Sequence, residues 1–253
     1  MSVGEFVGLV LAGVAAGVTG TVAGLASLFS YPALLGAGLP ATVANVTNTV
    51  ALAVGNVTVV PSSRRELRGQ RAAIVRLGVA CAAGSAAGAA LLLVTPPGVF
   101  ERVVPFLVGG ASVVILRRQP SGGDGPGGTV KWSAVGGMFA VALYSGYFAA
   151  ASGVVMLALL LATSASEGLL RSNALKNVLV GIADVVAAAG FAVFGHVAWG
   201  MAVPLTLGLL AGSWLGPPLA RRLPARALRV GIGVAGLGLA VKLGVDAFQG
   251  GSA

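Results

Sequence analysis

Charged residues are scarce in this chain of 253 amino acids. They make up 9% of it, whereas a soluble domain carries about 25%. Hydrophobic residues make up 57%. A chain of this composition cannot cover a water-facing surface with polar side chains, so a soluble globular domain is excluded.

Cysteine and histidine are nearly missing as well, since each occurs once, as Cys81 and His196. A single cysteine cannot form an internal disulfide, and we interpret Cys81 as a small packing residue. One histidine and one cysteine are too few for a metal site of the usual kind. We therefore expect neither a metal nor a cofactor.

What the chain has in abundance is long apolar runs. About 20 apolar residues are enough to cross a bilayer as a helix. Only helices and closed barrels satisfy the backbone in lipid, and these runs do not alternate as barrel strands do. The sequence therefore predicts an all-α polytopic protein of the cell membrane. The runs are Phe6–Leu35, Val43–Pro61, Ala72–Val94, Val99–Leu116, Trp132–Ala162, Ala174–Phe194, Met201–Ala220 and Val230–Phe248.

Acidic residues are outnumbered, with 7 Asp and Glu against 16 Lys and Arg, and the net charge is +9. In a soluble protein such a surplus suggests a nucleic-acid partner. Between membrane spans, basic residues mainly set the orientation in the bilayer. We therefore expect the lipid bilayer as a partner and no nucleic acid.

The two halves of the chain correspond at an offset of about 128 residues. Asn45 aligns with Asn173, Asn56 aligns with Asp184, and the triplet Ala-Gly-Ser at 83–85 aligns with the same triplet at 211–213. A Gly/Pro-rich polar segment lies at the midpoint. We predict a first transmembrane repeat at 1–118, a cytoplasmic linker at 119–130 and a second repeat at 131–253, forming one unit.

The arginines predict the topology of these repeats. The basic segments at 62–76 and 221–229 should both be cytoplasmic. Both can be so only if Trp132–Ala162 is a hairpin of two short helices. The length of Phe6–Leu35 and of Trp132–Ala162, about 30 residues each, exceeds one span and predicts a hairpin in both, with breaks near Gly20–Gly24 and Ser152–Gly153. The prediction is two inverted repeats, each a broken-helix hairpin plus three full transmembrane helices, giving 8–10 helical segments with both termini external. Such an architecture is typical of secondary transporters.

Glycines spaced four apart allow helices to approach closely in lipid. We interpret them as helix contacts inside one protomer rather than as a dimerisation face. The sequence does not decide between a monomer and a homodimer. The pairs are Gly13/Gly17, Gly20/Gly24, Gly84/Gly88, Gly208/Gly212 and Gly212/Gly216.

Polar side chains interrupt the apolar segment from Arg171 to Asp184. On a helix, Asn173, Lys176, Asn177 and Asp184 share one face. A charge at the bilayer centre costs about 2.5–3.5 kcal/mol, so this face should point toward other helices or toward a water-filled cavity. Lys176 either binds substrate or extends to the cytoplasmic interface. Asp184 either couples transport to protons or only hydrogen-bonds a neighbour. The asparagine side chains of this segment and of the matching segment in the first half either bind the substrate or form hydrogen bonds between helices. The candidate ligands on the two helices are Asn45, Asn48, Asn173, Lys176 and Asn177.

The two helix breaks supply the other half of the predicted site. Short helices that start at a break present free N–H groups and a positive dipole end, which favour an anion. Thr21, Gly24 and Ser27 lie at the first break, and Ser152 lies at the second. One embedded acid is too little for a divalent cation. These features together predict a pocket for a small oxyanion.

The sequence resembles the sulfite exporter TauE/SafE family of membrane transporters. Two segments carry the resemblance. They are Gly20–Asn48, with its "GLP" and "TN", and Arg171–Arg229, with "NALK", "GHVAW" and "GSWLGPPLARRL". The resemblance implies transport of sulfite, a sulfonate or a related organosulfur or carboxylate anion, coupled to a proton or sodium ion. Alanines occupy both breaks where the family has more glycines, at 23, 26 and 149–151. We therefore expect a substrate that can differ from sulfite.

Other functional classes fit the sequence less well. No GxxxxGK[ST] loop is present, which disfavours a nucleotide-driven pump. An enzyme would need a nucleophile–base or acid–base set, and His196, Cys81 and Asp184 do not make one. Lys176 and Asp184 argue against a purely structural scaffold. An anion channel remains the alternative to a secondary transporter working by alternating access.

Overall fold

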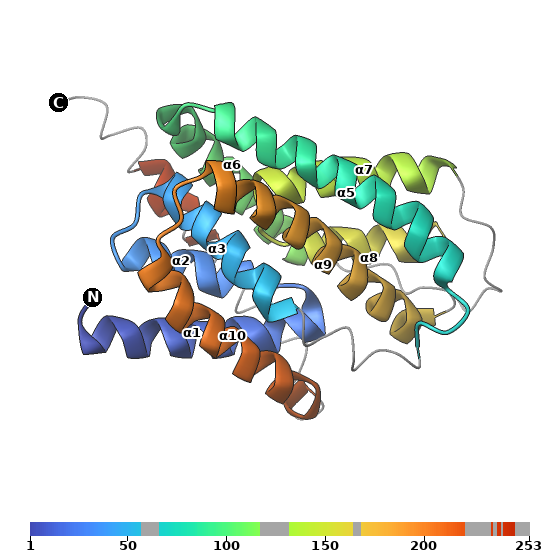
Figure 1. The fold of residues 1–253 in the computed structure, drawn as a ribbon, viewed down its shortest axis with the longest axis horizontal. Coiled ribbons are helices and arrows are strands. Elements are labelled where there is room, and N and C mark those ends of the chain that lie inside the picture. Colours follow the sequence, from blue (N-terminus) through green and yellow to red (C-terminus); the bar gives the residue numbers. More distant parts are fainter. Residues whose placement is uncertain are drawn as a thin grey trace.

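The computed structural model describes residues 1–56, 66–116, 132–163 and 168–220, and near the C-terminus residues 234, 237–238 and 240–245. These residues form α-helices and contain no strand, which confirms the predicted all-α fold (Figure 1). The helices are α1 (Val3–Ala23), α2 (Ser27–Gly36), α3 (Ala41–Asn56), α5 (Arg71–Val94), α6 (Pro97–Leu116), α7 (Trp132–Tyr147), α8 (Ser152–Ala162), α9 (Gly168–Phe194) and α10 (Trp199–Ala220).

Several of the described helices can cross a bilayer. Three have both the length and the apolar character required, with mean hydropathy of 1.7 for Val3–Thr21 and 2.0 for both Arg71–Val94 and Arg171–Phe194. Two shorter apolar helices lie at Ser152–Ala162 and Trp199–Leu215. This pattern is that of a multi-pass membrane protein. The predicted linker and the arginines at 64, 65, 221, 222, 226 and 229 lie outside the described residues.

Both long segments expected to be hairpins are broken into two helices. The first break follows α1, whose C-cap is Gly24 in the left-handed region at φ 70°. The second precedes α8, where Ala151 adopts a left-handed φ of 56°. A left-handed alanine is strained by about 1–2 kcal/mol relative to a glycine. The prediction of two short helices per hairpin is wrong for α1, which has 21 residues, whereas α2, α7 and α8 have 10, 16 and 11.

The glycines of α1 explain its length, because they pack against α10 rather than ending the helix. A Cβ added to Gly13 would lie 2.9 Å from the Cα of Gly208, and one added to Gly17 would lie 2.6 Å from the backbone nitrogen of Ser213. The pair α5 and α7 is equally close, since a Cβ on Gly84 would lie 3.1 Å from that of Ala142. Packing inside the protomer is thus confirmed for these glycines, while that of Gly216 is not described.

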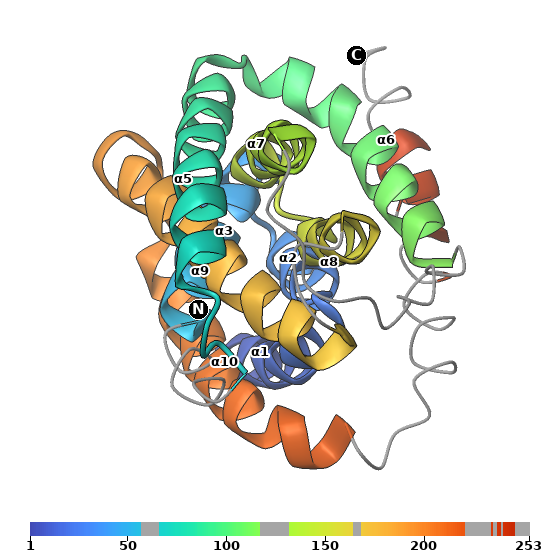
Figure 2. The ribbon, with the colours of Figure 1, turned by 90° about the vertical axis from the view of Figure 1, so that its right-hand side faces the viewer.

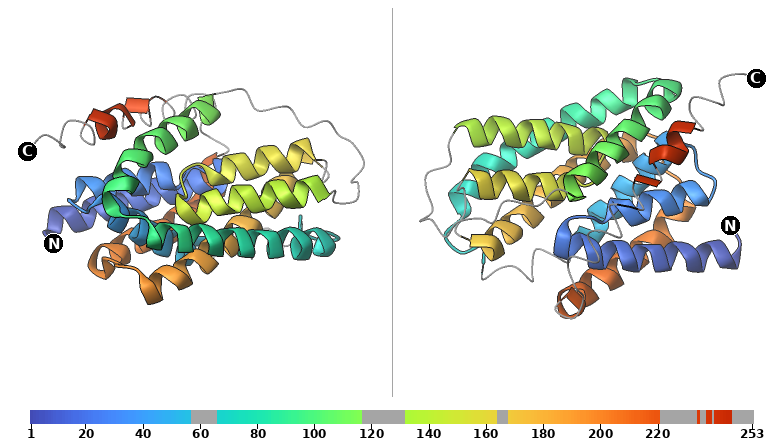
Figure 3. Two further views of the ribbon diagram at one scale, coloured as in Figure 1. Left: turned by 90° about the horizontal axis from the view of Figure 1, so that it is seen from above. Right: turned by 180° about the vertical axis from the view of Figure 1, so that it is seen from behind.

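The element order repeats along the chain. At the offset of about 128 residues, α1 corresponds to α7, α2 to α8, α3 to α9 and α5 to α10. The packing corresponds too, because α1 lies along α10 as α7 lies along α5. Figure 1 shows that α1 and α7 start at opposite ends of the long axis, and Figure 2 shows both hairpins nearly end-on. The helical residues 240–245 lie beside α6 (Figure 3), with the Cβ of Ala240 3.6 Å from one added to Gly109.

An aromatic cluster holds the second break against α2 and α6. The rings of Tyr31 and Phe148 meet edge to face with centroids 5.3 Å apart, and Phe100 contacts Tyr147 and Phe148 at 5.7 and 6.1 Å. Tyr31, Phe100 and Phe148 are buried. Edge-to-face pairs of this kind stabilise beyond their buried area, by about 0.5–1.5 kcal/mol each. The position of the residues between α7 and α8 is therefore fixed by helices from the other half.

Candidate functional site

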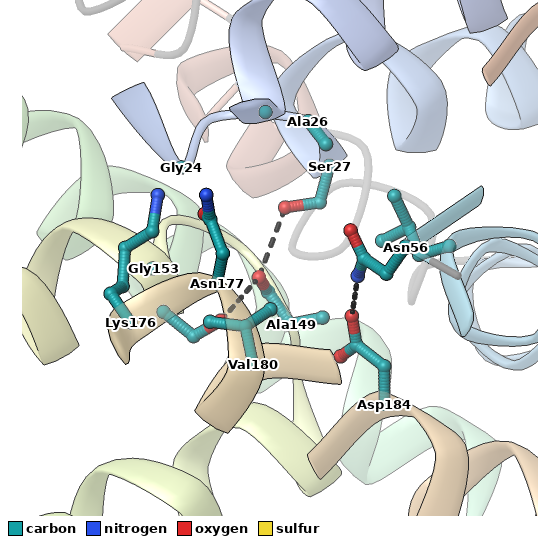
Figure 4. A pocket seen from close by; sticks show the side chains of 13 residues that line it. Gly24, Ala26, Ser27, Asn56, Ala149, Gly153, Lys176, Asn177, Val180 and Asp184 are labelled. Atoms are coloured by element: carbon teal, nitrogen blue, oxygen red, sulfur yellow. Dashed lines mark hydrogen bonds between the residues drawn. The ribbon is translucent and has the colours of Figure 1, made fainter. Parts of the chain in front are cut away.

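A small cavity lies where the two helix breaks meet α3 and α9 (Figure 4). Its volume is about 40 Å³. A single water needs about 10–15 Å³ on the same measure, so the cavity is sized for a small solute. The lining residues are Gly20, Gly24, Ala26, Ser27, Leu52, Asn56, Ala149, Ser152, Gly153, Lys176, Asn177, Val180 and Asp184.

The two breaks touch each other beside this cavity. A Cβ added to Gly24 would lie 2.9 Å from the carbonyl carbon of Gly153, and one added to Gly153 would lie 2.9 Å from the Cα of Gly24. The hydroxyls of Ser27 and Ser152 both donate to the carbonyl oxygen of Ala149, at 3.0 and 3.2 Å. Backbone contact and shared hydrogen bonds therefore join the two breaks into one structure.

Two helices begin at the cavity. Ser27 is the first residue of α2 and Ser152 is the first residue of α8, and neither helix has a side-chain cap. Most of the first N–H groups donate to carbonyl oxygens of the residues just before each helix, as those of Leu28 and Val154 do at 3.2 and 3.0 Å. Each helix start still carries the positive end of the helix dipole. Two such ends therefore direct positive potential at the same small volume.

Lys176 is the cationic side chain that lines this cavity. Its exposure is 1%, and its Nζ has no hydrogen-bond partner among the described residues. In Figure 4 the side chains of Lys176 and Asn177 both point from α9 toward Gly24. The alternative that Lys176 extends to the cytoplasmic interface is therefore wrong. A charged side chain inside the membrane is costly, so an ionisable residue buried there is a candidate functional residue.

Asp184 lies two helical turns further along α9, about 12 Å from Lys176 along the helix axis. Its exposure is 3%, and its Oδ2 accepts a hydrogen bond of 2.7 Å from the Nδ2 of Asn56. Asn56 and Asp184 are counterparts at the repeat offset, 128 residues apart. These two residues come from different halves of the chain, so the cavity lies where the two halves meet.

Comparison with known proteins identifies the family of the chain. A family model described as Sulfite exporter TauE/SafE matches residues 9–243, a range that includes the whole cavity. The chain belongs to the sulfite exporter TauE/SafE family. No curated protein and no solved structure matches it. As a TauE/SafE member it is a membrane transport protein.

Five of the nine ligands predicted from sequence line the cavity of this TauE/SafE protein. Gly24, Ser27, Ser152, Lys176 and Asn177 do so, as does the proposed coupling residue, Asp184. They come from both breaks and from α9. The structure thus brings together segments that are far apart in the chain, as expected from the sequence.

The other predicted ligands lie elsewhere. The Nδ2 of Asn45 donates to the carbonyl oxygen of Tyr147 at 2.9 Å, so it ties α3 to the second break. The hydroxyl of Thr21 donates within α1, to the carbonyl oxygens of Gly17 and Val18. Asn48 and Asn173 do not line the cavity, although each has a buried Oδ1 without a partner among the described residues.

Sequence reasoning missed several residues of the TauE/SafE cavity. Asn56 was interpreted as a structural counterpart of Asp184, and the two in fact contact each other. The repeat offset carried a usable signal, because Leu52 and Val180 are also counterparts and both line the cavity. The cavity residues that were not predicted as ligands are Gly20, Ala26, Leu52, Asn56, Ala149, Gly153 and Val180.

Proposed function

We propose that this TauE/SafE protein is a secondary transporter that moves a small oxyanion, sulfite or a related sulfur-containing or carboxylate anion, across the cell membrane by alternating access. The observation that carries the proposal is the buried amino group of Lys176, which has no hydrogen-bond partner among the described residues, in a cavity at which two helices begin. A desolvated cation and two helix N-termini bind an anion and repel a cation.

The composition of the cavity supports an anion of few atoms. Lys176 supplies a positive charge and Asn177 supplies an amide. At the other end of the cavity, Asp184 is already hydrogen-bonded to Asn56. Ala26 and Ala149 line the wall. A volume of about 40 Å³ favours an inorganic or very short organic anion over a bulky one.

The arrangement of the repeats supports alternating access. The two hairpins enter from opposite ends of the long axis (Figure 1), and the cavity lies between them. Inverted repeats of this kind place the substrate at their interface and rock around it. We therefore propose inverted repeats at 1–118 and 131–253, with the linker at 119–130 in the cytoplasm and both termini external.

Counterflow in proteoliposomes tests the proposed function. Vesicles preloaded with unlabelled sulfite should take up labelled sulfite faster than empty vesicles, with saturation at high concentration. The recovered sulfite should be chemically unchanged. A rate that rises linearly with concentration and ignores the preloaded anion would indicate a channel, and a modified product would indicate an enzyme.

The replacement Asp184→Asn tests proton coupling, which we propose for the carboxylate of Asp184. An amide at this position can still bond to Asn56, so the fold should persist, but it cannot exchange a proton. We expect an inward pH gradient to lose its effect on uptake, while counterflow stays within about two-fold of the wild type. Uptake driven by a pH gradient and by a sodium gradient is the measurement.

The variant Asn56→Ala is the control for Asp184→Asn. It removes the hydrogen bond of 2.7 Å and keeps the carboxylate. We expect it to retain proton-driven uptake. If Asp184→Asn also retains it, or if a sodium gradient alone drives uptake, then Asp184 is not the proton-coupling residue.

Cysteine labelling tests the inverted topology. Cys81 is first replaced by alanine, and single cysteines are then placed at Gly123 and Ala225. We expect both to react with a membrane-impermeant maleimide from the cytoplasmic side only, because the positive-inside rule places both segments there. Labelling from opposite sides would refute the inverted arrangement.

A further inference from the structure

A second, larger hollow lies on the outside of the helix bundle, between α5 and α7, with a volume of about 560 Å³. This outer groove is defined by Val75, Arg76, Val79, Trp132, Gly136 and Phe139, together with small residues of α5. Its size falls within the range of ligand sites, which is about 300–1,000 Å³. It shares no residue with the cavity of the transport site.

The outer groove is apolar along its length and basic at one end. Val75, Val79 and Trp132 are 58%, 67% and 81% exposed, so large apolar side chains face outward. The guanidinium of Arg76 lies over the ring of Trp132, 6.0 Å from its centroid. No ion pair of Arg76 with a described carboxylate is present. The arginine is therefore held at the mouth of an apolar channel with its charge available.

The position of this end in the membrane suits a lipid headgroup. Tryptophan is enriched at the membrane–water interface, and the arginines around α5 predict a cytoplasmic location for its start. The cytoplasmic leaflet is the one that carries anionic lipids, and each basic residue near its surface contributes attraction. Trp132 and Phe139 are seven residues apart on α7, so the apolar part extends about 10 Å into the bilayer.

The corresponding face of the other half lacks these features. At the repeat offset, Arg76 corresponds to Pro204 and Trp132 corresponds to Gly4. The helices α1 and α10 pack as closely as α5 and α7, so the fold itself requires no Arg–Trp pair there. The pair is therefore a particular feature of one side of the molecule.

We propose that the outer groove binds one anionic phospholipid, with its phosphate at Arg76 and an acyl chain along Val75, Val79 and Phe139. The occupant is a lipid because the outer groove places a single positive charge at the end of an apolar surface, at a membrane interface. A free phosphate would gain nothing from the apolar part. A second copy of the chain would have to place a carboxylate against Arg76.

Native mass spectrometry of the purified full-length protein, with phosphatidylglycerol or phosphatidylcholine added, tests this proposal. The wild type should retain one phosphatidylglycerol in preference to phosphatidylcholine. Arg76→Gln should weaken retention of phosphatidylglycerol about five-fold, the effect of one interfacial charge. The matched control is Arg71→Gln, because Arg71 is an exposed arginine of the same helix end that does not line the groove.

A second variant tests the apolar part separately. A Cβ added to Gly136 would meet no atom within 4 Å, so Gly136→Leu fills the groove without disturbing the fold. It should abolish retention of the lipid, whereas Gly110→Leu, at an equally open position on α6, should not. Equal retention of both lipids by the wild type, or unchanged retention in Gly136→Leu, would overturn the proposal. If Gly136→Leu instead splits a dimer that retains no lipid, the groove is a subunit interface.

Discussion

Replacing Lys176 with methionine is expected to abolish saturable anion uptake and to make the protein harder to unfold. The amino group of Lys176 is buried and has no partner in the part of the chain that the structure describes. Removing its charge therefore relieves a cost of about 2.5–3.5 kcal/mol on insertion scales. Methionine has a similar length and fills the same volume. Loss of one member of a buried charge pair costs about 2–5 kcal/mol, so anion affinity should fall at least about 30-fold. A purely structural lysine would not produce this combination of effects, because its removal would make the protein easier to unfold.

Two measurements on the same samples check this expectation. The apparent melting temperature of Lys176→Met should rise by several degrees without substrate, and added sulfite should no longer raise it further. The matched control is Lys242→Met, which removes an exposed lysine of the C-terminal helix and should behave as the wild type. Normal counterflow in Lys176→Met would refute the proposed site, whatever the change in stability.

Leucine at Gly88 or at Gly212 is expected to prevent assembly of the helix bundle. A Cβ at Gly88 would collide with the carbonyl oxygen of Leu143 in α7, and one at Gly212 would collide with that of Val14 in α1. The obstacle in both cases is backbone, which no rotamer change can move. Each substitution should therefore separate a pair of helices that the fold holds in direct contact.

Size-exclusion chromatography in detergent measures this effect as loss of the monodisperse peak. The control is Gly110→Leu, because a Cβ there meets no atom within 4 Å and the position faces outward. We expect the control to purify as the wild type does. A monodisperse Gly88→Leu or Gly212→Leu protein with normal counterflow would show that these helices do not need their close approach.

Much of the fold could be predicted from the sequence because lipid leaves the backbone few choices. Apolar runs had to become helices, and segments of roughly 30 residues exceed one span, so both hairpins were expected. The length of α1 could not be predicted in the same way. Glycines at Gly13 and Gly17 have the spacing of a packing face and also the composition of a weak helix. Only the presence of α10 alongside decides between the two.

The candidate site was predicted in composition but not in detail. Asn45 and Asn177 have the same chemistry and comparable surroundings in sequence, yet one ties α3 to the second break and the other lines the cavity. The direction of each side chain depends on the rotation of its helix against the other half. Contacts such as that of Ser27 with Ala149, 122 residues apart, follow from this rotation and leave no local signal.

The hydrogen bond between Asn56 and Asp184 has a consequence for how such a site can arise. In a symmetric pair of identical chains, the residue on the axis faces its own copy, and two carboxylates there would repel each other. A single fused polypeptide escapes this restriction, since its halves mutate independently. One side can then carry an acid and the other an amide donor. A chain with two fused repeats can therefore place an acid opposite an amide on its symmetry axis, whereas a homodimer cannot.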